Sequence, residues 1–376
     1  MRPLTGPRLE SIASALPTPC WSTSELLVAA RGHLSERLEE MLVSLGVEER
    51  HSVLGNYDRV LFDEEEPKLD ISATELAVEA ARKCLVSADV APSSIGLVLG
   101  VTSSPGRLLP SLVCDVMAQM PELPRTAATL SISYMGCSAV AKVIDTAQWF
   151  LSCHPDQRVL VCFLEAITPL SPDLPGFYSH FSEVRPEDRQ LTVNAMHGFL
   201  FGDAAVAMVL SADGTGPEFG PVTHLTNDLA EDTELGTVPD GGSDLPLVQG
   251  RRLYTLSPDV TSRGTFYASR TVRTLLDSSD CGVSDLSDAT AVLMHTGSRR
   301  ILDGLCDTFG IAADSEAVAS SYRVLRDYGN TLGCSVPLML ADPVTRPAGE
   351  GVLVAFGLSF SCGAFSVTFP AGGWAP

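Results

Sequence analysis

Short apolar runs alternate with longer segments of helical spacing along the first half of the chain. The runs at 95–100, 158–163 and 204–210 consist almost entirely of apolar residues and glycine, and each is too short for a typical helix. Such runs predict strands that are buried on both faces. Because helical segments follow these strands, the pattern indicates a layered α/β fold.

A stretch rich in glycine, proline and polar residues at 211–220 follows the third of these strands. Turn-forming residues of this kind punctuate a chain, so we place a domain boundary there, between an N-terminal half (1–215) and a C-terminal half (216–376). The stretch at 227–250 is acidic and shows little apolar periodicity. We expect it to be a solvated excursion.

The second half of the chain repeats features of the first. The run at 289–294 is similar to the run at 95–99, and each leads into a helical segment. The segments 134–138 and 328–335 both end in Gly-Cys-Ser, and each opens an apolar helix that is followed by a strand. Internal similarity of this kind predicts two similar α/β halves, each contributing a helix N-terminus to a shared centre.

Composition narrows the class of protein. Hydrophobic residues make up 45% of the 376 residues and charged residues 19%, which is typical of a folded chain with a sizeable core. No uncharged apolar run is long enough to span a bilayer, and the N-terminal segment lacks the apolar core of a secretory signal, so we expect a cytoplasmic protein. The net charge of −21 argues against nucleic acid and anionic membranes as partners.

The ten cysteines are scattered and lack the spacing of a metal site. We therefore expect reduced cysteines and assign no metal. Cys137 is distinctive because it lies between Gly136 and Ser138, directly before the apolar helical segment 139–150. A sulfur in the first turn of a helix lies near exposed N–H groups and the positive dipole end, which favour the thiolate. Taken alone, Gly-Cys-Ser is more typical of a buried helix start than of a nucleophile, and Cys334 shares that context.

Two further polar residues are candidates for chemistry. His295 directly follows a predicted strand, and catalytic groups collect at the carboxyl ends of strands in open α/β sheets. His197 is its nearest rival among the other histidines. Asn330 lies in a Tyr-Gly-Asn-Thr segment that would ordinarily form a turn. An amide can nevertheless donate a hydrogen bond without titrating, which suits stabilisation of an enolate.

Together these residues resemble the condensing enzymes of the thiolase superfamily, in particular β-ketoacyl-acyl-carrier-protein synthase III and the type III polyketide synthases. The resemblance covers most of the chain and implies a thiolase-like fold with two similar α/β halves packed as layered αβαβα. The motifs that carry it, in order, are 11–17, 45–51, Gly136-Cys137-Ser138, Phe201-Gly-Asp-Ala-Ala205, His295-Thr-Gly297, 328–338 and 355–357.

The resemblance implies two half-reactions. Cys137 would take an acyl group from a thioester of coenzyme A or an acyl carrier protein, with the backbone N–H groups of Cys137 and Ser359 holding the oxyanion. His295 and Asn330 would then stabilise the enolate of a malonyl-type or β-keto thioester, which forms the carbon–carbon bond. The family also implies a homodimer and no cofactor beyond the thioester substrates. Glu165 matches a family glutamate, and we interpret it as structural in preference to a general base.

The turn at 357–360, Gly-Leu-Ser-Phe, is bulkier than the family pattern, and the family's basic residues for the thioester carrier are not located. We therefore expect an unusual substrate, as in secondary metabolism, in preference to fatty-acid initiation. Two alternatives stay open. One is an acyltransferase that passes the acyl group from Cys137 to a hydroxyl or amine. The other is an inactive partner subunit of a heterodimeric synthase.

Overall fold

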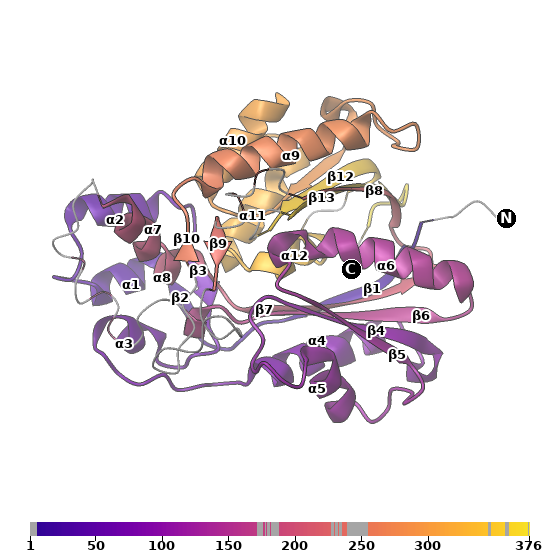
Figure 1. Cartoon of the computed structure of the whole chain (residues 1–376), viewed down its shortest axis with the longest axis horizontal. Helices are drawn as coiled ribbons and strands as arrows, with labels where there is room; N and C mark the ends of the chain where they lie inside the picture. The colour runs from indigo at the N-terminus through magenta and orange to yellow at the C-terminus, as the bar shows by residue number, and fades with distance from the viewer. Residues whose placement is uncertain are drawn as a thin grey trace.

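The computed structural model describes residues 6–170, 176, 178, 181, 188–226, 229, 232, 235–238, 255–344, 347–357, 361–374 and 376. These residues form five layers that alternate between helices and sheet (Figure 1). The layered αβαβα fold is confirmed. Nine described strands form the two sheet layers in the order β11-β12-β13-β8-β1-β7-β6-β4-β5, and a single residue pair, Arg8 with Glu218, joins β1 to β8.

The two sheet layers share one topology. In the first, β1 and β6 flank β7 in antiparallel pairing, while β4 and β5 continue in parallel from β6. In the second, β8 and β12 flank β13 in antiparallel pairing, and β11 continues in parallel from β12. The strands are β1 Arg8–Ala15, β4 Ile95–Thr102, β5 Ala128–Ser133, β6 Arg158–Glu165, β7 Ala204–Ser211, β8 Glu218–Thr226, β11 Ala291–Met294, β12 Gly349–Phe356 and β13 Ser361–Phe369.

The sheets confirm the strands that the apolar runs predict. Every residue of β7 is buried, as are seven of the eight residues of β6, because helices cover both faces of the sheet. The chain passes from the first sheet to the second between β7 and β8, at the turn-rich stretch. The division into domains 1–215 and 216–376 stays a prediction.

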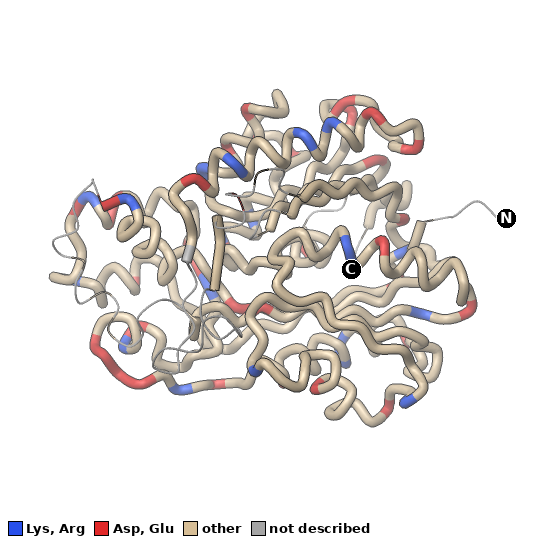
Figure 2. The backbone as a smooth tube through the Cα atoms, viewed as in Figure 1, with Lys and Arg blue, Asp and Glu red and all other residues tan. Residues whose placement is uncertain are grey.

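Helices form three layers around the two sheets (Figure 1). Helices α4 (Ala73–Ser87) and α5 (Leu112–Gln119) cover the outer face of the first sheet, and α9 (Val260–Leu276) with α10 (Arg299–Phe309) covers the second. Between the sheets lie α6 (Ala139–Cys153) and α12 (Ser335–Leu340). Charged residues lie mainly on the outer helices and loops, while the central strands carry few (Figure 2).

The remaining elements gather mostly at one end of the layers, at the left in Figure 1. They are β2 Cys20–Ser22, α1 Thr23–Ala29, α2 Glu36–Val43, β3 Glu49–His51, α3 Tyr57–Phe62, α7 Arg189–Ala195, α8 His197–Leu200, β9 Gly236–Thr237, β10 Thr255–Leu256 and α11 Ala319–Tyr328. β9 pairs with β10, and the buried residues Asp232 and Leu235 precede β9. The expectation of a solvated excursion is therefore wrong for these described residues, whose side chains pack into the fold. The rest of 227–250 lies outside the described residues.

Local sequence explains where several helices begin and end. Ser72 and Glu75 form a reciprocal capping box at the start of α4, which satisfies two backbone donors at that end. Ser298 caps α10, and the helix ends at Gly310 in the left-handed conformation that glycine favours. Among the described residues, no helix combines the length and apolar character needed to cross a membrane.

Small residues allow the middle layer to approach the second sheet closely. A Cβ atom added at Gly363 in β13 would lie 2.3 Å from the Cβ atom of Ala141 in α6, so the helix would have to move. We predict that Gly363→Ala lowers the free energy of unfolding by about 1 to 3 kcal/mol, as overpacking does elsewhere. Chemical denaturation measures this value.

Gly304→Ala is the matched control, because a Cβ atom at Gly304 in α10 meets nothing within 4 Å. Alanine is the better helix former, so this variant should be unchanged or more stable by up to about 1 kcal/mol. Equal stability of the two variants would contradict close packing at Gly363.

Candidate active site

Three residues from different elements line one cavity of about 320 Å³: Cys137, His295 and Asn330. The first lies in the 3₁₀ turn that precedes the middle-layer helix α6, the second follows β11, and the third follows α11. The structure therefore brings together all three residues that the sequence predicts to act jointly. Most other lining side chains are apolar, including Leu200, Phe201, Leu332 and Phe356.

Cys137 lies in a single 3₁₀ turn, Gly136–Ser138, that leads directly into α6. Gly136 has a φ of 53°, in the left-handed region that glycine tolerates, and its N–H donates to the hydroxyl of Ser103 at 2.8 Å. The Cys137 side chain is buried, and its pKa is raised well above the ordinary value, first by burial and then by the charge of Glu165. The expected thiolate stabilisation by the helix N-terminus is thus outweighed, because desolvation disfavours the charged form.

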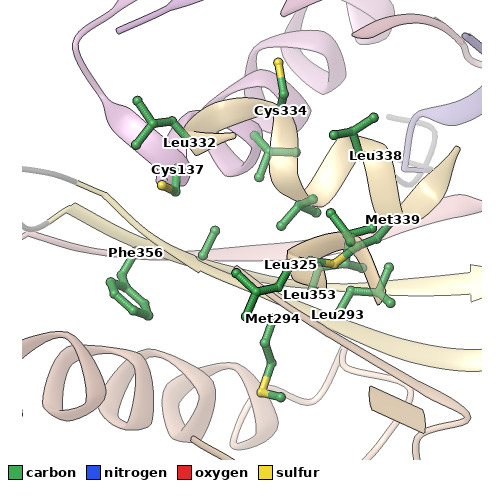
Figure 3. Close-up of a cluster of buried hydrophobic side chains, with 14 of the residues drawn as sticks. Cys137, Leu293, Met294, Leu325, Leu332, Cys334, Leu338, Met339, Leu353 and Phe356 are labelled. Atoms are coloured by element: carbon green, nitrogen blue, oxygen red, sulfur yellow. The ribbon is translucent and has the colours of Figure 1, made fainter. Parts of the chain in front are cut away.

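Cys334, the competitor of Cys137, occupies the equivalent turn of the second half, Leu332–Cys334. Its sulfur donates to the backbone oxygen of Ala204 at 3.3 Å, and the residue is not among those that line the cavity. In Figure 3 its sulfur points away from Cys137. The two Gly-Cys-Ser turns therefore differ in access, and only the first presents its thiol to the cavity.

His295 is held at the end of β11 by its backbone, whose N–H donates to Val354 of the neighbouring strand at 3.0 Å. Its ring stands edge-on to Phe356, with 5.4 Å between centroids and a 90° interplanar angle. Burial lowers the pKa of the ring to about 3. Among the described residues, no group forms a hydrogen bond with Nδ1. At neutral pH the ring is uncharged and can both donate and accept a hydrogen bond.

Asn330 connects the two halves of the fold. Its N–H donates to the oxygen of Leu200 at 2.8 Å, and its own oxygen accepts from Gly202 at 3.3 Å. The side-chain oxygen accepts from the N–H of Leu332 at 3.0 Å. A backbone N–H must face the oxygen of an amide, so the NH₂ group is the part left to donate into the cavity.

Glu165 and His197, which stood near the predicted site, are not among the residues that line the cavity. Glu165 ends β6, is buried, and accepts hydrogen bonds from both halves of the fold, which agrees with a structural interpretation. His197 is buried in α8 beside Phe201, and burial lowers its pKa to about 4. Ser359, the predicted second oxyanion donor, lies outside the described residues.

The cavity also has lining residues that the sequence analysis gave no role. Arg189 begins α7, and Arg300 lies in the first turn of α10, five residues after His295. Phe201 begins the motif Phe201–Ala205, and Arg300 follows the motif His295–Gly297 closely. Only the tertiary fold shows that both residues line the cavity. Among the described residues, no cluster of three or more His, Cys, Asp or Glu side chains is arranged to hold a metal ion.

Residues 282–369 match the family described as 3-oxoacyl-[acyl-carrier-protein] synthase III, C terminal. The chain is 28% identical over 310 residues to the β-ketoacyl-[acyl-carrier-protein] synthase III of Nitratidesulfovibrio vulgaris, covering 79% of this chain and 83% of that protein. It is also 28% identical over 317 residues to β-ketoacyl-[acyl-carrier-protein] synthase III 3 of Streptomyces coelicolor, with 79% and 83% covered.

Solved structures show the same fold. The C-terminal type III polyketide synthase domain of Steely1 from Dictyostelium superposes with a TM-score of 0.77 at 17% identity, covering 97% of this chain and 99% of that one. The 3-oxoacyl-(acyl carrier protein) synthase III of Pseudomonas aeruginosa PAO1 gives 0.73 at 21% identity, covering 97% and 98%. The chain therefore has a thiolase-like fold. In sequence it is similar to the β-ketoacyl-acyl-carrier-protein synthases III, and this similarity supports an acyl-transferring condensing enzyme.

The charge state of His295 gives a prediction for the site. Because burial holds its pKa at about 3, the ring should stay neutral from about pH 5 upward, whereas an unfolded histidine binds a proton below about pH 6.5. Native stability is therefore lost as pH falls from about 6.5 toward 3. Nitrogen NMR of histidine-labelled protein, assigned with His295→Asn, measures the state of the ring. A His295 signal that titrates near pH 6.5 would contradict the assignment.

Proposed function

We propose that the chain forms an acyl-Cys137 intermediate and condenses it with the enolate of a malonyl-type or β-keto thioester. The observation that carries the proposal is the shared cavity, in which one thiol meets a neutral imidazole and an oriented amide. The apolar lining suits an acyl chain, because burial of apolar surface favours its binding.

In the first half-reaction the sulfur of Cys137 attacks the carbonyl carbon of an acyl thioester. The sulfur–carbon bond to the carrier breaks, and the proton of the thiol passes to the departing carrier thiolate. The high pKa of Cys137 means that the thiol is the resting form, so the proton leaves only as the reaction proceeds. The backbone N–H of Cys137, at the start of α6, supports the oxyanion that develops on the carbonyl.

In the second half-reaction the carbon–carbon bond to the carboxylate of a malonyl-type thioester breaks, and the electron pair forms an enolate as carbon dioxide leaves. A ring N–H of His295 and the NH₂ of Asn330 donate to the enolate oxygen. A neutral imidazole suits this step, because it donates without requiring a permanent charge in a buried site. The enolate carbon then attacks the acyl-Cys137 carbonyl, the carbon–sulfur bond breaks, and the Cys137 sulfur regains a proton.

Arg189 and Arg300 add positive charge to the wall of a cavity in a chain with a net charge of −21. Arg189 also lies 3.8 Å from the carboxylate of Asp259, whereas positive charge at the wall favours thioesters whose carriers hold phosphate groups, such as coenzyme A or a phosphopantetheine arm. This supports acyl thioesters of anionic carriers as the substrates.

Intact-mass measurement after incubation with a panel of acyl thioesters tests the intermediate. The wild type should gain the mass of one acyl group, Cys137→Ala should not, and Cys334→Ala should retain the gain because its thiol lies outside the cavity. Labelling that is lost in Cys334→Ala and kept in Cys137→Ala would refute the assignment. No acyl mass gain in the wild type or in any variant, with every donor tested, would instead favour the inactive-subunit alternative.

Asn330→Ala should separate the two half-reactions. Loss of one oxyanion-type donor lowers rates by about 10² to 10³ in comparable sites, so release of carbon dioxide from a malonyl thioester should fall by this factor. Acylation of Cys137 should stay within a few-fold of wild type, because the amide serves the second step. Rapid-quench acylation and carbon dioxide release measure the two separately. An ester or amide product without carbon dioxide release would support acyl transfer to oxygen or nitrogen instead.

A further inference from the structure

Glu165 lies between the two Gly-Cys-Ser turns and is not used in either half-reaction described above. Its carboxylate accepts from the backbone N–H of Ser103 at 3.1 and 3.2 Å and from the hydroxyl of Ser104 at 2.6 Å, both in the loop after β4. It also accepts from the N–H of Gly333 in the second half at 3.3 Å. The carboxylate therefore spans the interface between the halves.

Each of these contacts leads to a residue of the proposed site within a few atoms. The hydroxyl of Ser103 accepts the N–H of Gly136, the residue before Cys137. Gly333 belongs to the turn that begins at Leu332, whose N–H holds the side chain of Asn330. A Cβ atom at Gly333 would lie 2.9 Å from Oε1 of Glu165 and 3.5 Å from the backbone oxygen of Gly136, so the turns are in close contact there.

Among the described residues, the groups that hydrogen-bond the carboxylate are the N–H groups of Ser103 and Gly333 and the hydroxyl of Ser104, a set of donors that matches an ionised carboxylate. The titratable groups whose charges act on or near it are the thiols of Cys137 and Cys334, and the charge of Glu165 raises the pKa of both. Burial raises the pKa of Glu165 itself to about 7, so its charge changes near neutral pH.

We propose that Glu165 is a positioning residue that holds the turn of Cys137 and the turn beside Asn330 in a fixed relation, and whose negative charge restrains thiolate formation at Cys137. This rests on the proposed function, in which Cys137 is the nucleophile. A general-base role does not fit, because the carboxylate is enclosed by donors and does not line the cavity. Fixing both turns through one group keeps the acyl-sulfur and the enolate oxygen in register.

The pH profile of Cys137 alkylation by iodoacetamide tests the inference, with the modified residue identified by peptide mass spectrometry. Above pH 7, where Glu165 is ionised, Glu165→Gln should alkylate several-fold faster than wild type, because a nearby like charge shifts a pKa by about one unit or more. Below about pH 6 the difference should vanish, because the wild-type carboxyl is then protonated. A rate ratio that is constant across pH would overturn the electrostatic role.

Asp203→Asn is the matched control for burial. Asp203 is a buried carboxylate that accepts from the N–H groups of Val53, Ile167 and Thr168, but none of these belongs to a Gly-Cys-Ser turn. It should lose stability while the pH profile of Cys137 alkylation keeps the wild-type form. If Asp203→Asn changed the pH profile of Cys137 alkylation in the same way as Glu165→Gln, the effect would come from loss of a buried carboxylate in general, and the specific role of Glu165 would be refuted.

Ser103→Ala separates position from charge. It removes the acceptor of the Gly136 N–H but leaves the carboxylate in place, so alkylation should show the wild-type pH profile while acylation by thioesters slows by about tenfold or more. Unchanged acylation would overturn the positioning role. Alkylation needs no acyl transfer, so a failure of Cys137 to become acylated would sink the proposed function without deciding the outcome for Glu165.

Discussion

A layer of helices packs between the two sheets and contacts both of them. Helix α6 meets a sheet on each side, so it has to be apolar around most of its surface and small where it contacts Gly363. Such a helix cannot shift without disturbing both sheets, because packed interiors leave little free volume. The buried 3₁₀ turn Gly136–Ser138, which carries Cys137 and leads into α6, is thereby held in place.

The same packing sets the electrostatics of the site. Burial raises the pKa of the Cys137 thiol and lowers that of the His295 ring, so both side chains are neutral at rest. A neutral pair avoids the cost of keeping two isolated charges in an apolar cavity. In the proposed reaction, charge develops only as bonds change, when backbone N–H groups and the Asn330 amide are already oriented to receive it.

Much of the fold follows from the sequence, because the apolar runs at β4, β6 and β7 are long enough to be strands and too short to be helices. Cys137, His295 and Asn330 were predicted from local context, and the fold brings them to one cavity. Local context could not separate Cys137 from Cys334, since both follow Gly and precede Ser. The separation comes from Ala204, whose carbonyl accepts the Cys334 thiol across 130 residues of chain. The pKa of the Cys137 thiol and the contacts of Glu165 also depend on residues that are distant in the sequence. The position of Cys137 before a helix predicts a stabilised thiolate, whereas burial and the charge of Glu165 raise its pKa.

The difference between the two Gly-Cys-Ser turns shows what a fold of two similar halves makes available. Such a fold presents two helix starts at one centre, and a change at one need not be mirrored at the other. Here Cys137 of the first turn lines the cavity. In the second turn the thiol of Cys334 donates to the backbone oxygen of Ala204, and the nearby Asn330 lines the cavity. In the proposed reaction, the two turns of this near-symmetric backbone divide covalent capture and carbanion stabilisation between them.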